Sequence, residues 1–240
     1  MASYDPKAFY DAMSKAYDEK TSTGVWNEMY DRPNVIALIP EANVLDVLEV
    51  GCGSGGLTKW LVNQEYHVSA FDISPNLLKI AQGKVGAKAK LFVADATKPL
   101  TMISSNSVDL IVSSLVFHYI EDWDPLFKEL KRVLRSSGSI VFSTHHPHAD
   151  WIWCEKENYF TKEIYEETWT VAGHPYLVQY YHRTLMEMFE IFKKNGFYVD
   201  ELKEPFPLPE VKKIDLKTYE KLTSKPNFLY FRLKKQKIAS

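Results

Sequence analysis

Cysteine is scarce in this 240-residue sequence, in which only Cys52 and Cys154 occur. Two cysteines so far apart provide neither the disulfide framework of a small secreted domain nor the paired CxxC motifs of a zinc site. Long apolar runs are also absent: none reaches the ~18 residues needed to span a bilayer, and the charged N-terminus lacks the apolar segment of a signal peptide. We therefore expect a cytoplasmic protein without disulfides and without membrane insertion.

Excess charge of one sign is missing as well. The 29 lysines and arginines nearly balance the 31 aspartates and glutamates, and a net charge of −2 argues against a strongly basic nucleic-acid clamp. Apolar residues make up 45% of the chain, as in ordinary globular proteins, and no repeat or low-complexity linker divides it. We expect one domain over residues 1–240 and no DNA partner.

Short apolar runs alternate with amphipathic stretches from residue 44 to residue 145. The stretches predict helices that begin near Leu57, at Ser74-Pro75 and at Asp124-Pro125, and Gly138 is expected to stop the last of them. This alternation is typical of βαβ units, so we expect an α/β fold with a doubly wound, mostly parallel sheet. The strands predicted from the apolar runs are 44–50, 67–71, 90–94, 108–113 and 139–143.

The C-terminal part has a different order of elements. A helix is predicted over 181–194, followed by strands at 197–202 and 228–233 with no helix of the core type between them. Because the last strand enters without a proper crossover, we expect it to be antiparallel and the sheet to have seven strands. Lysines are frequent between residues 212 and 237, which indicates a solvated surface; an RNA- or anionic-lipid-facing patch is the alternative.

A helical cap at the edge of the sheet is predicted for residues 1–39. Its aromatic side chains Tyr17, Trp26 and Tyr30 either cover a ligand, where an aromatic face attracts a sulfonium, or pack the cap helices together. The cap precedes a core over residues 40–145.

An aromatic insertion is predicted for residues 146–180, before the C-terminal helix and closing strands of 181–240. Segments 164–171 and 176–180 flank the turn residues 172–175, which predicts a hairpin. Because the insertion follows the fifth strand directly, we expect it to act as a lid over a substrate. The alternative is that its aromatic residues only form the core of the hairpin.

A glycine-rich loop, GCGSGG at residues 51–56, follows the first predicted strand. It contains the GxGxxG pattern of dinucleotide sites, whereas the P-loop pattern is absent. Glu49, two residues before the loop, suits a ligand with an ammonium and a sulfonium and is a poor neighbour for a pyrophosphate. Asp72 ends the second strand, where it can accept both ribose hydroxyls, and Asp95, followed by Ala96, ends the third, where it can accept from an adenine amino group. These features favour S-adenosylmethionine (SAM) over a dinucleotide.

Four segments in order, EVGCGSG (49–55), FDIS (71–74), VADAT (93–97) and DLIVSSLVFHYIEDW (109–123), resemble the successive motifs of class I SAM-dependent methyltransferases. The resemblance is closest to the branch that methylates small molecules, of the ubiquinone/menaquinone type. It implies SAM as cofactor and a small organic acceptor methylated on O, N or C. The cofactor-binding residues that we assign with it are Tyr17, Glu49, Gly51, Cys52, Gly53, Gly55, Asp72, Ile73, Asp95, Ala96 and Ser113.

Other functions fit the sequence less well. Residues 113–116 read SSLV in place of the [DNS]PP[YFW] segment of adenine-N6 and cytosine-N4 DNA methyltransferases, and neither cysteine follows a proline as the cytosine-C5 nucleophile does. Two alternatives stay open: an NAD(P)-dependent oxidoreductase that uses the GxGxxG-like loop, and a SAM-binding module without catalysis.

Histidines are the candidates for proton removal from an acceptor, because their unperturbed pKa lies near neutrality. His145 and His146 come just after the fifth predicted strand, and His118, a weaker candidate, follows the fourth. Methyl transfer can also proceed by positioning alone, and each of these side chains can instead have a structural role. His145, His146, His148 and Cys154 lack the spacing of a zinc site, so we predict no metal.

Overall fold

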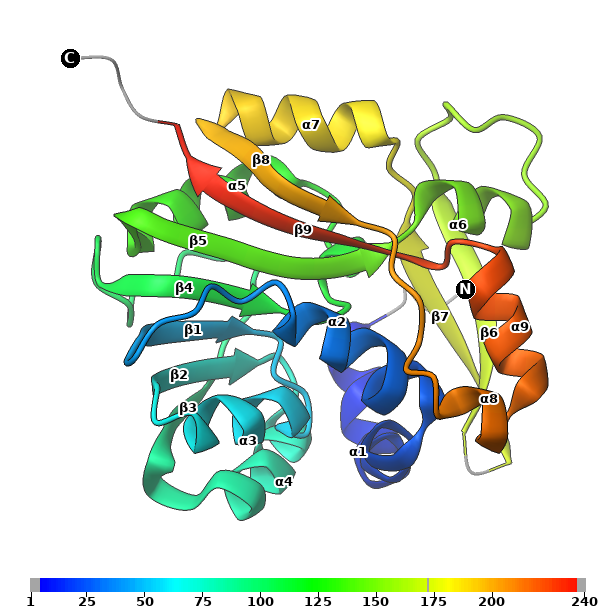
Figure 1. Cartoon of the computed structure of the whole chain (residues 1–240), viewed down its shortest axis with the longest axis horizontal. Helices are drawn as coiled ribbons and strands as arrows, with labels where there is room; N and C mark the ends of the chain where they lie inside the picture. The colour runs from blue at the N-terminus through cyan, green and yellow to red at the C-terminus, as the bar shows by residue number, and fades with distance from the viewer. Residues whose placement is uncertain (1–4, 172, 237–240) are drawn as a thin grey trace.

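The computed structural model describes residues 5–171 and 173–236 and contains a seven-stranded sheet in the order β3-β2-β1-β4-β5-β9-β8 (Figure 1). The first five strands are parallel, and β9 is antiparallel to both of its neighbours. This confirms the predicted fold class, including the antiparallel last strand. The strands are β1 (Asp46–Val50), β2 (His67–Asp72), β3 (Ala89–Val93), β4 (Val108–Ser113), β5 (Leu134–His145), β8 (Phe197–Lys203) and β9 (Phe228–Lys235).

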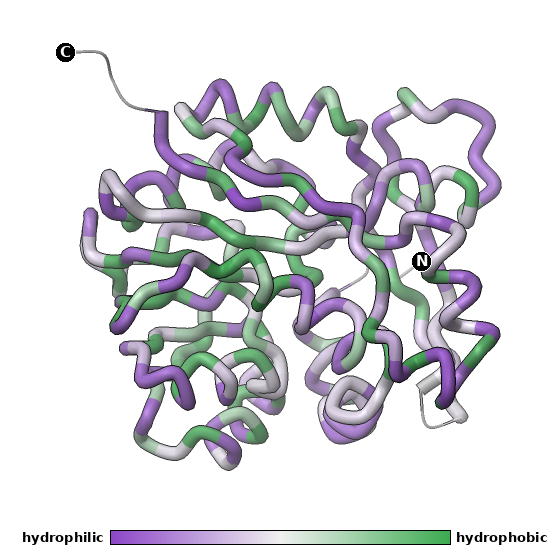
Figure 2. The backbone as a smooth tube through the Cα atoms, viewed as in Figure 1, coloured by the Kyte–Doolittle hydropathy of each residue, from purple (hydrophilic) through white to green (hydrophobic). Residues whose placement is uncertain are grey.

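Helices cover both faces of the sheet because successive side chains of each buried strand point to opposite sides. In β1, Leu48 and Val50 join the cluster beneath the helices α5 and α7, whereas Val47 joins the cluster beneath α3. Figure 2 shows the apolar colour concentrated in the central strands. The helices of the core are α3 (Gly56–Asn63), α4 (Pro75–Val85), α5 (Trp123–Val133) and α7 (Leu185–Lys194), with short 3-10 turns η2 (Gly86–Lys88) and η3 (Phe117–Tyr119).

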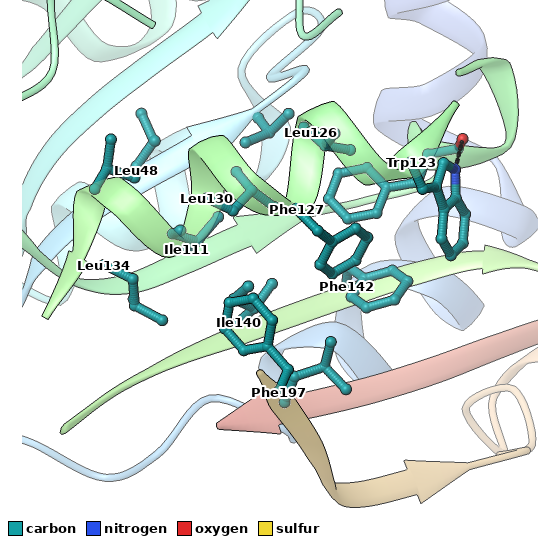
Figure 3. Close-up of a cluster of buried hydrophobic side chains, with 14 of the residues drawn as sticks. Leu48, Ile111, Trp123, Leu126, Phe127, Leu130, Leu134, Ile140, Phe142 and Phe197 are labelled. Carbon is teal, nitrogen blue, oxygen red and sulfur yellow. Dashed lines mark hydrogen bonds between the residues drawn. The ribbon is translucent and has the colours of Figure 1, made fainter. Parts of the chain in front are cut away.

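The helix α5 is fixed to the sheet by large buried side chains. Figure 3 shows Leu126, Phe127 and Leu130 of this helix pointing at the strands, and Trp123 Nε1 donates a hydrogen bond to the Phe117 carbonyl over 2.8 Å. Two details of the prediction for this region were wrong. Asp122, not Asp124, is the N-cap, and the helix ends at Val133, well before Gly138, because β5 begins at the next residue.

The C-terminal part also departs from the prediction. Helix α7 begins at Leu185, after a capping box at Thr184, because Tyr181 belongs to a strand that pairs with Ile164. Between β8 and β9 the chain forms two short helices, α8 (Val211–Ile214) and α9 (Leu216–Ser224). They lie beside the hairpin rather than over the sheet (Figure 1).

The cap is helical, and it consists of α1 (Pro6–Thr23), a π-helix η1 (Val25–Asp31) and α2 (Arg32–Ile36). Helix α1 is fastened to the start of α4: Asp11 accepts hydrogen bonds from Ser74 Oγ over 2.5 Å and from the Asn76 backbone N–H over 3.2 Å. Asp18 forms an ion pair with Lys84 further along the same two helices. The cap therefore lies against the carboxyl ends of β1 to β4 rather than only at an edge of the sheet.

The insertion contains an unpredicted helix α6 (Pro147–Trp153) and the predicted hairpin, β6 (Ile164–Val171) and β7 (His174–Tyr181), which forms a separate two-stranded sheet. Ala172 of the predicted turn lies outside the described residues. Phe9 of α1 makes edge-to-face contacts with Trp169 and Tyr176, so the cap and the hairpin form one continuous cover. No helix in the described ranges combines the length and apolar character needed to cross a bilayer.

Candidate functional site

A cavity lies at the carboxyl ends of the central strands of the sheet. The strand order reverses between β1 and β4, and a crevice at this point is where ligands of open α/β sheets bind. A first cavity of about 140 Å³ lies there, between the strand ends and helix α1. Residues that follow each of the first four strands line it, as do three tyrosines: Gly51, Gly53, Asp72, Ile73, Asp95, Ala96, Ser114, Tyr10, Tyr17 and Tyr119.

The glycine loop has one position that faces this cavity openly. Gly53 has φ +54, and a Cβ added there would meet only Tyr17 Cε1, at 3.6 Å. At Gly55 a Cβ would instead lie 2.8 Å from the Ala81 Cβ of α4, and at Gly51 2.4 Å from Val116 Cγ2. Gly53 is therefore the position where a ligand can approach the backbone, whereas the other two allow the loop to pack.

Asp72 holds this loop and faces the cavity. Its Oδ2 accepts the Gly53 N–H over 2.8 Å, and its Oδ1 accepts the Ser74 N–H over 2.9 Å. Burial raises the pKa of Asp72, although these backbone N–H groups favour the charged form. A ribose would add hydroxyl donors to the lone pairs that remain.

Glu49 lies behind the loop, buried with Thr58 at the start of α3. Burial raises the pKa of Glu49 to about 8, and Thr58 and the Arg32 guanidinium offset this only in part. Among the described residues, Glu49 Oε2 has no hydrogen-bond partner. An ammonium or sulfonium in the adjacent cavity would stabilise this carboxylate, so the residues present fit SAM and would be ill suited to a pyrophosphate.

The structure divides the predicted cofactor residues into two groups. Seven line the first cavity: Tyr17, Gly51, Gly53, Asp72, Ile73, Asp95 and Ala96. Glu49, Cys52, Gly55 and Ser113 do not line it. Ser113 Oγ donates to the Val50 carbonyl over 2.9 Å and the Cys52 N–H donates to the Phe71 carbonyl over 2.9 Å, so these residues fix the strand ends. Ser113 does not line the first cavity, whereas its neighbour Ser114 does.

A second cavity of about 410 Å³, the size of a pocket for a small molecule, adjoins the first. The two share Tyr10, Tyr17, Leu115 and Tyr119 in their walls. The cap, α6, the hairpin and α9 supply the remaining walls, which are rich in aromatic rings. The aromatic residues that line it are Tyr10, Tyr17, Trp26, Tyr119, Trp153, Trp169, Tyr180 and Phe228.

Two of the predicted histidines lie together in the second cavity. The rings of His118 and His145 stack with centroids 3.7 Å apart, and His145 Nδ1 lies 3.2 Å from Asp150 Oδ1. Tyr180 meets the His145 ring edge-on at 4.7 Å. Burial, with His145 and Arg183 nearby, holds the pKa of His118 well below its usual value, so His118 is neutral at pH 7.

His146 lines neither cavity, so the structure does not support the prediction that it is a catalytic residue. Its Nε2 lies 2.8 Å from Glu204 Oε1, and its Nδ1 accepts the His148 N–H over 3.2 Å as the N-cap of α6. Both ring nitrogens therefore have structural partners. Tyr30 is likewise no cover for a ligand, because it is buried and stacked on Phe228, whereas Trp26 lines the second cavity.

Sequence reasoning missed the segment that separates the two cavities. Leu115 lines both and has φ +54, a left-handed conformation that is unusual for a leucine; its N–H donates to Ser143 Oγ over 3.0 Å. The neighbouring Ser114 hydroxyl donates to Asp31, a buried carboxyl whose pKa burial raises to about 6. Nothing in the letters SSLV signals this backbone conformation, and Asp31 lies far away in the sequence.

Comparisons with known proteins agree with this geometry. Residues 48–142 match a family model described as a methyltransferase domain. The chain is 36% identical over 108 residues, 42% of its length, to a malonyl-[acyl-carrier protein] O-methyltransferase of Paenibacillus sp., of which it covers 39%. It is 32% identical over 126 residues, 50% of its length, to a phosphoethanolamine N-methyltransferase of Triticum aestivum, of which it covers 25%. Each curated relative is thus matched over less than two thirds of its own length.

Similarity to a solved structure extends over most of the chain. A crystal structure of an S-adenosylmethionine dependent methyltransferase from Mesorhizobium loti superimposes with a TM-score of 0.72 at 25% identity. The match covers 84% of this chain and 95% of that one.

The geometry predicts a specific effect of Gly53→Ala. The added methyl group would occupy the side of the loop that faces the first cavity, so binding of S-adenosylhomocysteine (SAH) should weaken by about tenfold or more. Gly86→Ala is the matched control, because Gly86 also has a positive φ (57°) and open space around it but does not line the cavity. Gly53→Ala should lose about 1–2 kcal/mol of stability through its positive φ, and Gly86→Ala about 1–3 kcal/mol, because Gly86 (φ 57, ψ −139) lies near a backbone region essentially restricted to glycine. Calorimetric titration that finds equal SAH affinity in both would show that the loop only packs.

Glu49→Gln should change both the pH dependence of stability and proton release. The folded protein holds the Glu49 proton to about pH 8, whereas the unfolded chain releases it near 4.5, so wild-type stability falls as pH rises between these values. The variant should match the wild type at pH 4 and exceed it by on the order of 2 kcal/mol at pH 8. Exposed Glu41→Gln is the control.

The same variant tests the charge on the ligand. A cationic ligand lowers the pKa of Glu49, so the wild type should release a proton when SAM binds at pH 7, and Glu49→Gln should release less. Titration calorimetry in two buffers of different ionisation enthalpy measures this difference. Equal proton release by both proteins would contradict the assignment.

Proposed function

We propose that this chain, which carries a class I SAM-dependent methyltransferase domain, is an enzyme that transfers the methyl group of SAM to a small organic acceptor. The observation that carries the proposal is the pair of adjoining cavities with Tyr10, Tyr17, Leu115 and Tyr119 in the walls of both. Such an arrangement lets a cofactor in the first cavity present its methyl group to an acceptor in the second.

The cofactor supplies an activated methyl group on a sulfonium, and the residues of the first cavity bind and orient it. Asp72 would hold the ribose hydroxyls, Asp95 and Ala96 would hold the adenine, and Glu49 would provide the compensating negative charge behind the loop. Tyr17 lines the same cavity, with its Cε1 3.6 Å from where a Cβ on Gly53 would lie, and an aromatic ring there can attract a cation. Holding two reactants in line in this way accounts for much of the rate.

The residues of the second cavity exclude water and accept a proton. His145 Nδ1 forms no hydrogen bond among the described residues, although Asp150 Oδ1 lies 3.2 Å away, so a ring nitrogen is free to accept a proton. His145 therefore takes the proton from an O–H or N–H acceptor, and the neutral His118 holds its ring by stacking. The hairpin closes the cavity through Trp169 and Tyr180, in keeping with a lid.

Eight aromatic side chains around the second cavity favour a planar acceptor. Quinone-type rings, the class implied by the sequence motifs, belong to this group, and we propose methylation of such a ring on O, N or C. We further propose that the enzyme acts in the cytoplasm, where the free thiols of Cys52 and Cys154 would stay reduced.

A methyl-label experiment tests the proposed activity directly. Purified protein is incubated with methyl-tritiated SAM and, separately, with small-molecule, RNA and protein fractions of a cell extract. We expect label in the small-molecule fraction. Tight binding of NAD(P)H without SAH binding would indicate an oxidoreductase, and SAH binding without transfer to any fraction would indicate a non-catalytic module; either result overturns the proposal.

His145→Asn should lower turnover of an acceptor identified in this way by about a hundredfold or more, because proton removal by a positioned base contributes on this scale. Its SAH affinity should stay within about twofold of the wild type. His146→Asn is the matched control, since asparagine can still cap α6 and the side chain does not line the cavity. Equal turnover in both variants would show that the reaction uses no base at His145.

A further inference from the structure

Lys221 of α9 lies in an unusual place for a lysine. Its ammonium reaches the wall of the second cavity and lies 3.6 Å from the ring centroid of Trp153 and 5.1 Å from that of Trp26. The neighbouring Lys217 of the same helix is exposed and lies outside the cavity wall. The prediction of a solvated surface for the lysine-rich stretch is therefore wrong at Lys221.

A second ammonium, that of Lys20, also lies in the wall of the second cavity. It comes from α1, where its Nζ is 5.1 Å from the ring centroid of Trp169 in the hairpin. Lys20 is more exposed than Lys221, so it contributes at the rim of the cavity and its electrostatic effect is more strongly screened.

Neither ammonium has a carboxylate partner in the parts of the chain that the structure describes, where no ion pair within 4 Å involves Lys20 or Lys221. Glu167 also lines the cavity and acts on Lys221 from a greater distance. Burial lowers the pKa of Lys221, which Glu167 offsets only in part. A cation between two indole rings is attracted by their faces, but this attraction is weaker than that of a bound anion.

We infer that the acceptor carries an anionic group, a carboxylate or a phosphate, and that Lys221 binds it with help from Lys20. This deepens the proposed function and rests on it. The two lysines hold the anionic end, the aromatic walls hold the planar part, and His145 lies in the same cavity to take a proton from the reacting atom. Glu167 opposes the anion and so limits its affinity.

Matched pairs of small ligands test this inference by binding alone. The SAH-loaded protein is titrated with 4-hydroxybenzoate and its neutral amide, 4-hydroxybenzamide, and with phenyl phosphate and phenol, using ligand-observed NMR. We expect each anion to bind at least about tenfold more tightly than its neutral partner, which corresponds to about 1.4 kcal/mol. The relative affinity of the two anions distinguishes a carboxylate site from a phosphate site.

Three variants assign the effect to named residues. Lys221→Met keeps the aliphatic stem and should reduce the preference for the anion to about twofold or less, while Lys217→Met should retain it. Glu167→Gln should strengthen anion binding by a few-fold, the opposite sign. All three should bind SAH as the wild type does, because none of these residues lines the first cavity.

Two different failures are distinguishable. Loss of SAH binding in the wild type would contradict the proposed function itself. SAH binding without a preference for the anions, including the case in which no probe binds, or a preference that Lys221→Met leaves intact, would overturn only the assignment of the anion site. A melting curve for each variant shows that it is folded before its binding is compared.

Discussion

The reversal of strand order between β1 and β4 is the constraint on which the rest of this molecule depends. Crossover helices on either side of the reversal leave the sheet in opposite directions, so these crossover helices leave the carboxyl ends of the central strands open. The glycine loop, Asp72 and the segment after β4 all lie at this edge because their strands end there. The cap and the insertion then cover the opening, and the space they leave forms two adjoining cavities.

The two cavities differ in electrostatic character, although Asp150 and Glu167 also lie in the wall of the second. Around the first cavity, Glu49, Asp72 and Asp31 are buried carboxyls whose pKa values burial raises. A cation bound there would stabilise their ionised forms. In the wall of the second, Lys20 and Lys221 contact indole rings and lack a carboxylate within ion-pair distance among the residues described. A cationic cofactor in the first cavity and an anionic acceptor in the second would thus each meet groups of the opposite charge. This favours binding of each molecule in its own cavity.

Local patterns in the sequence were enough for the sheet and for much of the cofactor side. Asp72 and Asp95 could be predicted because the end of a parallel strand places its next residue at the binding edge, whatever the rest of the chain does. The fold class predicted from these motifs is confirmed, and residues 48–142 match a family model described as a methyltransferase domain, as the motifs predict. The same patterns say nothing about the direction in which a side chain points. Ser113 was therefore assigned although Ser114 lines the first cavity, and His146 was ranked with His145 although only His145 lines the second.

The contacts that long-range packing creates could not be predicted, although several residues of the second cavity could. Lys221 reaches Trp26 and Trp153 only after α9 packs beside η1 and α6, and Asp31 meets Ser114 across 83 positions of the sequence. A crystal structure of the protein with bound SAH tests the account most directly. The account predicts ribose hydroxyls on Asp72, adenine beside Ala96 and the sulfur directed past Leu115 toward His145. SAH bound elsewhere, or with its sulfur directed away from the second cavity, would contradict it.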